Sequence, residues 1–176
     1  RGEAVAAVIG TPEAIAKFDP DSFPVTWIEL PSVNDIASAQ NPEATQLHEG
    51  RDLNIMCGGL VNSGDANAAL ERADITVEGH YRSGFVEHAY IEPGAGFAQM
   101  VNGRVEIHAC TQSPVMDLDS LEIILGIDRS MIRIVPTAVG GGFGSKLDIS
   151  VQPFLALGAM KTGKPVRICY SRTESM

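Results

Sequence analysis

The most constraining feature of the chain is the glycine-rich loop Gly140–Lys146, which reads GGGFGSK. Four of its first five residues are glycine, and such a run is costly in backbone entropy, so something in the fold must require it. One interpretation is a tight connection between a strand and a helix. The other is a loop whose backbone N–H groups approach a bulky anionic or oxo ligand beside a helix N-terminus.

Two phosphate-binding templates fail on this loop. A P-loop needs Gly-Lys-Ser/Thr, but the chain has Ser145-Lys146-Leu147 in that place. The dinucleotide motif G-x-G-x-x-G fails in both registers, because its last position falls on Ser145 when counted from Gly140 and on Leu147 when counted from Gly142. A phosphate-binding module built on this loop therefore remains only a weak alternative.

Composition argues against several further classes of protein. The 176 residues carry 13 Lys+Arg and 22 Asp+Glu, a net charge of −9, and an acidic chain without a basic block argues against nucleic-acid binding. The longest apolar runs, such as Phe154–Met160, are far shorter than the roughly 20 residues that a membrane span needs. Three widely spaced cysteines predict neither a disulfide framework nor a metal cluster; they indicate core thiols in a reducing, cytoplasmic compartment.

Strand and helix patterns are mixed along the chain, which favours an α+β fold. Apolar and β-branched runs predict strands over residues 4–9, 24–30, 53–60, 75–81, 90–101, 104–110, 131–135 and 165–170. Capping signals and helical spacing predict helices over residues 12–18, 63–72, 114–125 and 149–162, and a short one capped by residues 32–35. Asn102-Gly103 predicts a two-residue hairpin turn.

Two further segments contain candidate functional side chains. Gln112 follows a strand and precedes a helix, so its amide either donates to a ligand oxygen or is incidental to a helix cap. Residues 87–93 hold two carboxylates and His88, but the four histidines share no ligand spacing. We therefore expect His88 to be a structural histidine with satisfied partners, and we assign no metal ligand and no catalytic residue.

Five segments in order resemble the xanthine dehydrogenase/aldehyde oxidase family of molybdenum hydroxylases: Glu78–Arg82, Glu87–Pro93, Thr111–Pro114, Gly140–Lys146 and Gly163–Arg167. Residues 53–176 resemble the first part of the family's molybdopterin-binding large subunit or domain. Residues 1–31 resemble the end of the α/β hammerhead domain that precedes it, and residues 32–52 are the predicted linker. The resemblance implies an α+β fragment of a longer chain.

The same resemblance implies roles for particular residues. Gln112 would hydrogen-bond the oxo group of molybdenum. Gly141, Gly142, Phe143 and Gly144 would line the metal and its dithiolene with backbone amides. The implied cofactor is a molybdenum-pterin whose dithiolene holds the metal in place of protein side chains. The implied reaction is hydroxylation with water as the oxygen source.

The chain also departs from the family pattern. Purine-hydroxylating members have a substrate-contacting glutamate where this chain has Leu147, so an aldehyde or another N-heteroaromatic is the expected substrate. The implied partners are iron–sulfur and FAD subunits or domains. The family's catalytic glutamate is not among these residues, and we expect the fragment alone to be inactive and empty of cofactor. The alternative is a non-catalytic assembly or interaction domain that keeps the fold without the cofactor.

Overall fold

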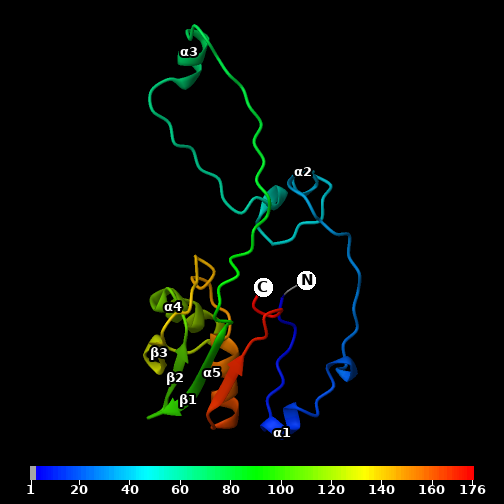
Figure 1. The fold of residues 1–176 in the computed structure, drawn as a ribbon, viewed down its shortest axis with the longest axis vertical. Coiled ribbons are helices and arrows are strands. Elements are labelled where there is room, and N and C mark those ends of the chain that lie inside the picture. Colours follow the sequence, from blue (N-terminus) through cyan, green and yellow to red (C-terminus); the bar gives the residue numbers. More distant parts are fainter. Residues whose placement is uncertain (1–2) are drawn as a thin grey trace. The chain divides into compact units, whose positions relative to one another are not determined.

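The computed structural model describes residues 3–176. They divide into two compact units: the first combines the chain up to Phe18 with Ser83–Met176, and the second is Asp19–Arg82 (Figure 1). No helix in the described part of the chain is long and apolar enough to cross a membrane. The domain boundaries expected at residues 31 and 52 remain predictions.

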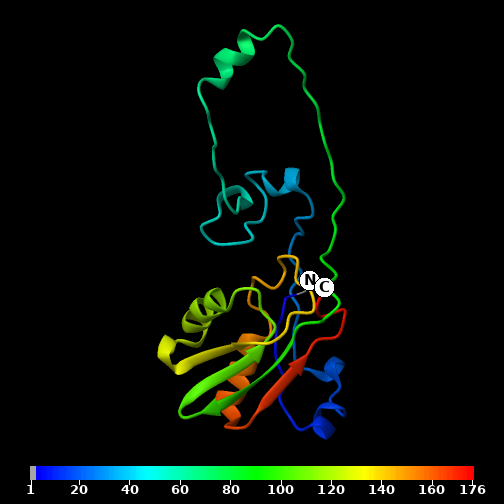
Figure 2. The same cartoon turned by 60° about the vertical axis from the view of Figure 1, so that its left-hand side comes forward.

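A four-stranded sheet forms the centre of the first unit (Figure 2). Its strands are β1 Ala95–Val101, β2 Arg104–Ala109, β3 Ile132–Pro136 and β4 Val166–Cys169. The spatial order is β3-β2-β1-β4; β1 pairs antiparallel with β2 and β4, whereas β2 and β3 are parallel. A parallel pair needs a crossover connection, which a helix between these two strands provides. The mixed sheet with its helices confirms the α+β class.

Two helices, α4 Pro114–Leu125 and α5 Gln152–Thr162, pack against this sheet. Each ends at a glycine in the left-handed conformation, as the capping signals predict. The prediction for α4 is confirmed over its whole length. The start of α5 was predicted too early, because Pro153 has no N–H to donate and is tolerated only in the first turn of a helix.

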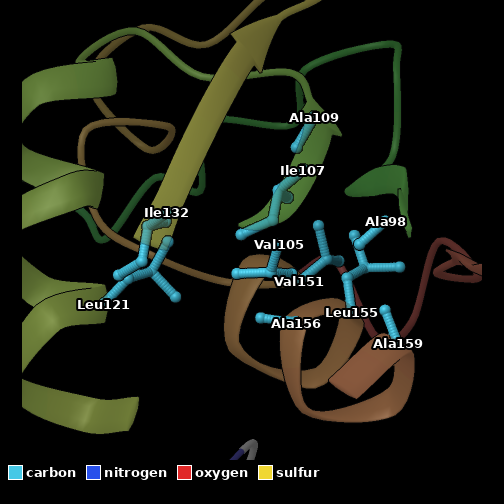
Figure 3. Packing of buried hydrophobic residues seen from close by; sticks show 10 residues of the cluster. All are labelled: Ala98, Val105, Ile107, Ala109, Leu121, Ile132, Val151, Leu155, Ala156 and Ala159. Atoms are coloured by element: carbon cyan, nitrogen blue, oxygen red, sulfur yellow. The ribbon is translucent and has the colours of Figure 1, made fainter. Parts of the chain in front are cut away.

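The hydrophobic core lies between the sheet and the two helices (Figure 3). In β2, the alternate residues Val105, Ile107 and Ala109 are buried, while Glu106 and His108 between them are only partly buried. The buried cluster consists of Ala98, Val105, Ile107, Ala109, Leu121, Ile132, Val151, Leu155, Ala156 and Ala159. Because β1, β2, β3 and both helices all contribute, removing these side chains from water stabilises the sheet as a single frame.

The predicted hairpin is confirmed. Val101 pairs with Arg104 across the turn, and Asn102 and Gly103 have φ angles of 50° and 80°. Positive φ at both central positions is the mark of a type I′ turn, whose twist matches that of the flanking strands.

Four of the predicted strands are wrong. Residues 4–9, 24–30, 53–60 and 75–81 form no strand, and nearly all of their side chains are exposed. Apolar and β-branched side chains suit a half-buried pleated surface, but a strand also needs a partner, and these segments pair with none of the described residues. The expectation of core thiols is right for Cys110 only, since Cys57 and Cys169 are exposed.

The remaining helices are short. They are α1 Pro12–Ile15, η1 Pro20–Ser22, α2 Ile36–Ala39, η2 Asp52–Asn54, α3 Ala66–Glu71 and η3 Arg129–Met131. The side chains of Thr11, Asp35 and Asp65 accept hydrogen bonds at the N-termini of α1, α2 and α3. This confirms the predicted starts of α1 and α2, whereas the helix expected over residues 63–72 begins only at Ala66, after its Asp65 cap.

One asparagine organises the second unit between α2 and η2. Asn54 accepts from the Leu47 N–H through Oδ1 at 2.8 Å. Its Nδ2 donates to the carbonyl oxygens of Ala39 at 3.0 Å and Thr45 at 3.1 Å. Asn54 itself has a φ of 55°, a conformation that asparagine tolerates better than most residues. The hydrogen bonds of this side chain therefore connect backbone segments that no helix or strand joins.

Candidate functional site

The sheet topology brings three separate segments to one edge (Figure 2). Because β2 and β3 are parallel, residues 110–114 and 137–146, which follow them, leave the sheet at the same edge. Because β1 is antiparallel to β2, residues 87–94 enter the sheet there too. The glycine-rich loop, the Gln112 segment and the segment before β1 therefore meet beyond the carboxyl ends of β2 and β3.

Hydrogen bonds join Gln112 to the glycine-rich loop. Its side-chain Oε1 accepts from the N–H groups of Gly144 at 3.1 Å and Lys146 at 3.2 Å. Its backbone N–H donates to the Lys146 carbonyl at 2.9 Å. The Nε2 group of Gln112 has no acceptor within residues 3–176, and the side chain is exposed. The carboxamide is thus held by its oxygen and keeps its two N–H donors free.

Two glycines of the loop are required by this arrangement. A Cβ on Gly142 would lie 2.3 Å from Oε1 of Gln112, so any side chain there would displace the carboxamide. Gly144, whose N–H binds the same oxygen, has a φ of 98°, which residues with a side chain rarely adopt. The glycines therefore allow the loop backbone to lie directly against the side chain of Gln112.

The amide segment Gly141–Phe143 carries three consecutive backbone N–H groups that donate to no acceptor in the described chain. Its last residue, Phe143, has a φ of 54° and is 75% exposed. Strained backbone of this kind persists where the surroundings impose it and is concentrated at functional sites. Successive backbone N–H groups without a partner are a donor set of the kind that binds anionic ligands, and Nε2 of Gln112 adds a further donor. An oxygen- and sulfur-rich group such as a metal dithiolene fits this donor set.

An ion pair between the buried Lys146, the last residue of the loop, and the partly buried Glu92 was not predicted from the sequence. Lys146 is only 6% exposed, and its Nζ lies 2.8 Å from Oε2 of Glu92. Burial favours the neutral form of the Glu92 carboxyl, but hydrogen bonds from Lys146 and the Gly140 N–H outweigh it and hold its pKa below the usual value. Burial alone would lower the pKa of Lys146, but the hydrogen bond to Glu92 and the electrostatic influence of Cys110 outweigh it and raise this pKa. The available signal was a lysine at the end of the glycine-rich loop.

Two other predicted residues lie close to the loop. His88 is exposed, and its ring has no hydrogen-bond partner among residues 3–176, so the expectation of satisfied partners is wrong. Its Nε2 lies 3.9 Å from the position of a Cβ on Gly144. Leu147 is 41% exposed and donates its backbone N–H to the Gly144 carbonyl. Within the described residues, no group of three His, Cys, Asp or Glu side chains could hold a metal ion.

Residues 47–176 match the family model of the molybdopterin cofactor-binding domain. The chain belongs to this family. The matched range contains the whole sheet, both large helices, Gln112 and the glycine-rich loop. The cofactor of the family is the molybdenum-pterin that the sequence resemblance implied.

Individual molybdopterin-binding relatives align over nearly all of the chain. It is 33% identical over 175 residues to the nicotinate dehydrogenase large molybdopterin subunit of Eubacterium barkeri, covering 99% of this chain and 41% of that protein. It is 31% identical over 175 residues to the xanthine dehydrogenase molybdenum-binding subunit of Escherichia coli, covering 98% of this chain and 23% of that protein. These matches confirm the resemblance to the xanthine dehydrogenase/aldehyde oxidase family.

A solved structure supports the fold. Aldehyde oxidoreductase from Desulfovibrio gigas superposes with a TM-score of 0.75 at 29% identity, over 84% of this chain and 16% of that one. The chain thus spans less than half the length of the relatives described above.

Proposed function

We propose that the chain forms part of the molybdopterin-binding site of a molybdenum hydroxylase that oxidises an aldehyde or an N-heteroaromatic compound, with water as the oxygen source. The observation that carries the proposal is the set of free donors at the sheet edge, Nε2 of Gln112 and the N–H groups of the amide segment. The names of two relatives, a nicotinate dehydrogenase and an aldehyde oxidoreductase, support the reaction class.

The molybdenum-pterin supplies two-electron redox chemistry when it is bound. Gln112 would donate from Nε2 to an oxygen ligand of the metal, and Gly141, Gly142, Phe143 and Gly144 would line the dithiolene. Because Oε1 of Gln112 already accepts two backbone hydrogen bonds, the carboxamide can face a ligand only as a donor. Pre-oriented donors of this kind need no rearrangement when the ligand arrives.

Leu147 is the residue proposed to contact the substrate. Its side chain is apolar and partly exposed directly after the glycine-rich loop. An apolar side chain offers no hydrogen bond to a polar purine edge, so the substrate would leave its own polar groups unpaired there. The proposal therefore assigns an aldehyde or a less polar N-heteroaromatic to this site.

Iron–sulfur and FAD subunits or domains are proposed as electron-transfer partners. The names of several relatives describe one subunit of a larger enzyme, which supports this part. The three free cysteines support a reducing, cytoplasmic compartment. We expect no turnover from residues 1–176 alone, because they span less than half the length of these relatives.

The test compares two variants of Gln112 in the full-length protein. Gln112→Glu keeps a side-chain oxygen for the two loop N–H groups but removes the Nε2 donors, whereas Gln112→Ala removes both. Molybdenum content by mass spectrometry and turnover in ¹⁸O-labelled water are measured for both variants. Gln40→Glu, at an exposed position, is the matched control.

We expect wild-type protein to contain molybdenum and to transfer ¹⁸O to an aldehyde or N-heteroaromatic. Gln112→Glu should keep most of the molybdenum and lose turnover on the order of 10²-fold, the usual effect of removing one pre-oriented donor. Gln112→Ala should lose molybdenum as well. Wild-type protein without molybdenum would favour the non-catalytic assembly domain. Unchanged turnover in Gln112→Glu would contradict the proposed role of Gln112 Nε2 as a hydrogen-bond donor.

A further inference from the structure

The Lys146 side chain is buried, and its ammonium group contacts three other groups. Its Nζ donates to Oε2 of Glu92 at 2.8 Å and to the Glu92 carbonyl at 3.1 Å. It also lies 4.6 Å from the centroid of the Tyr90 ring, which its charge attracts. Lysine is almost never fully buried without such partners. A lysine placed in this way fixes the position of its own backbone.

That backbone holds Gln112 at two points. The Lys146 N–H donates to Oε1 of Gln112 at 3.2 Å, and the Lys146 carbonyl accepts from the Gln112 N–H at 2.9 Å. Both the main chain and the carboxamide of Gln112 are therefore set by the place where Lys146 lies. A shift of Lys146 would turn the carboxamide and redirect its free Nε2.

Glu92 holds the other end of the same loop. Its Oε2 accepts from the Gly140 N–H at 2.8 Å, and its own N–H donates to the Gly140 carbonyl at 3.1 Å. A Cβ on Gly140 would lie 2.5 Å from the Glu92 Cβ, so a residue with a side chain at position 140 would clash with Glu92. One carboxylate thus fastens the glycine-rich loop at its first residue and, through Lys146, at its last.

We propose that Glu92 and Lys146 are positioning residues for the cofactor site: their ion pair closes the glycine-rich loop and thereby fixes the direction of Gln112 Nε2 and of the amide segment. The inference rests on the proposed function for the identity of the ligand. The closed loop itself is a property of this chain. An exposed ion pair such as Arg129–Asp119 has no comparable consequence, because solvent screens it and no loop depends on it.

Cys110 provides a readout of loop closure that does not depend on the cofactor. It is 5% exposed, and with Lys146 and Tyr90 it lines a cavity of about 190 Å³. Its Sγ donates to the carbonyl oxygen of Ala95, with 3.8 Å between the two atoms. If the ion pair opens, this thiol becomes accessible to an alkylating reagent.

The experiment uses the full-length protein with Lys146→Met, Glu92→Gln and the double variant. A short pulse of N-ethylmaleimide is followed by mass spectrometry of the Cys110 peptide, and molybdenum per chain is measured on the same samples. The double variant leaves no unpaired buried charge, so it remains informative if a single variant fails to fold. Lys164→Met, at an exposed position, and Leu121→Ala, which destabilises the core without touching the loop, are the controls.

We expect Cys110 labelling to rise at least ten-fold and molybdenum to fall at least five-fold in the Lys146 and Glu92 variants. Lys164→Met should match wild type, and Leu121→Ala should retain molybdenum in its folded fraction. The inference is overturned if either readout stays at the wild-type value in these variants. A wild-type protein that lacks molybdenum would instead count against the proposed function, and Cys110 labelling would still report whether the pair closes the loop.

Discussion

The side-chain amide of Gln152, at the start of α5, donates to Oδ2 of Asp117 in the first part of α4, with 3.0 Å between the two atoms. Each residue is 1% exposed. Oδ1 of Asp117 accepts no hydrogen bond within the described residues. The link joins the helix that follows Gln112 to the helix that follows the glycine-rich loop, and it leaves a buried carboxyl only half satisfied.

Asp117→Asn should stabilise the first unit at neutral pH. Burial raises the pKa of Asp117, and interactions with the side chains of Thr111 and Gln152 offset this only in part. The folded state therefore favours the protonated carboxyl, and its stability falls as the pH rises from the unfolded pKa through the raised folded one. The asparagine removes this penalty, so its gain, on the order of 1 kcal/mol, should be absent in acid and complete above the folded pKa.

Hydrogen exchange of the α4 and α5 amides in the full-length protein, measured across this pH range, would detect the change. Asp119→Asn is the matched control, because it removes an exposed carboxylate of the same helix. A gain that is independent of pH would show that the carboxyl of Asp117 is not the cause.

Gly96→Ala should destabilise the first unit by roughly 1–3 kcal/mol. A Cβ at this position in β1 would lie 2.5 Å from the His108 carbonyl oxygen and 2.9 Å from Cδ1 of Leu155. The backbone of β2 cannot move without breaking the ladder, so the sheet must absorb the strain. Gly58→Ala is the control, since a Cβ there meets nothing within 4 Å. Equal melting temperatures for the two variants would contradict the expected close packing of α5 on β1.

Leu147→Glu should change substrate preference and leave the fold unaffected. The side chain is 41% exposed, so a carboxylate there remains solvated and costs little stability. It would add an acceptor for polar purine edges and lower the complementarity to an apolar aldehyde. We expect kcat/KM for an aromatic aldehyde to fall about ten-fold and the ratio of purine to aldehyde turnover to rise. A Leu147→Met variant should retain the wild-type ratio.

Asn54→Ala should loosen the loop between α2 and η2 in the second unit. The substitution removes three hydrogen bonds to backbone groups and places alanine at a positive φ. The local cost should be roughly 2 kcal/mol, seen as faster hydrogen exchange at Leu47. Asn54→Gly relieves the backbone strain but not the lost hydrogen bonds, so it should recover only part of the protection. Complete recovery would assign the effect to φ alone.

Local signals predicted the elements that local rules determine. The α4 helix, its Gly126 end and the Asn102-Gly103 turn follow from capping and turn chemistry that act within a few residues. The strands expected at residues 4–9 and 75–81 depended on partners far along the chain, which propensity cannot supply. Helix caps and tight turns depend on contacts within a few residues, whereas a strand depends on a partner that can lie far away in the sequence.

The site was predictable in part for the same reason. The glycine-rich loop and Gln112 each stood out in the sequence, but only the parallel pairing of β2 and β3 brings them together. Glu92 and Lys146 are separated by 54 residues, and their pairing depends on both the antiparallel entry of β1 and the path of the loop. A pairing of two distant charged residues leaves no periodic pattern in the sequence, so only the folded structure reveals it.

The hairpin turn at Asn102-Gly103 lies at the end of β1 and β2 opposite to the candidate site. Six paired residues of β1 and β2 separate the turn from the edge that carries Gln112, a span of about 20 Å at the usual rise of a strand. Neither turn residue is buried, and a Cβ on Gly103 would meet nothing within 4 Å. The turn is therefore a suitable attachment point for a fluorescent label, from which cofactor loading can be followed without disturbing the loop that carries it.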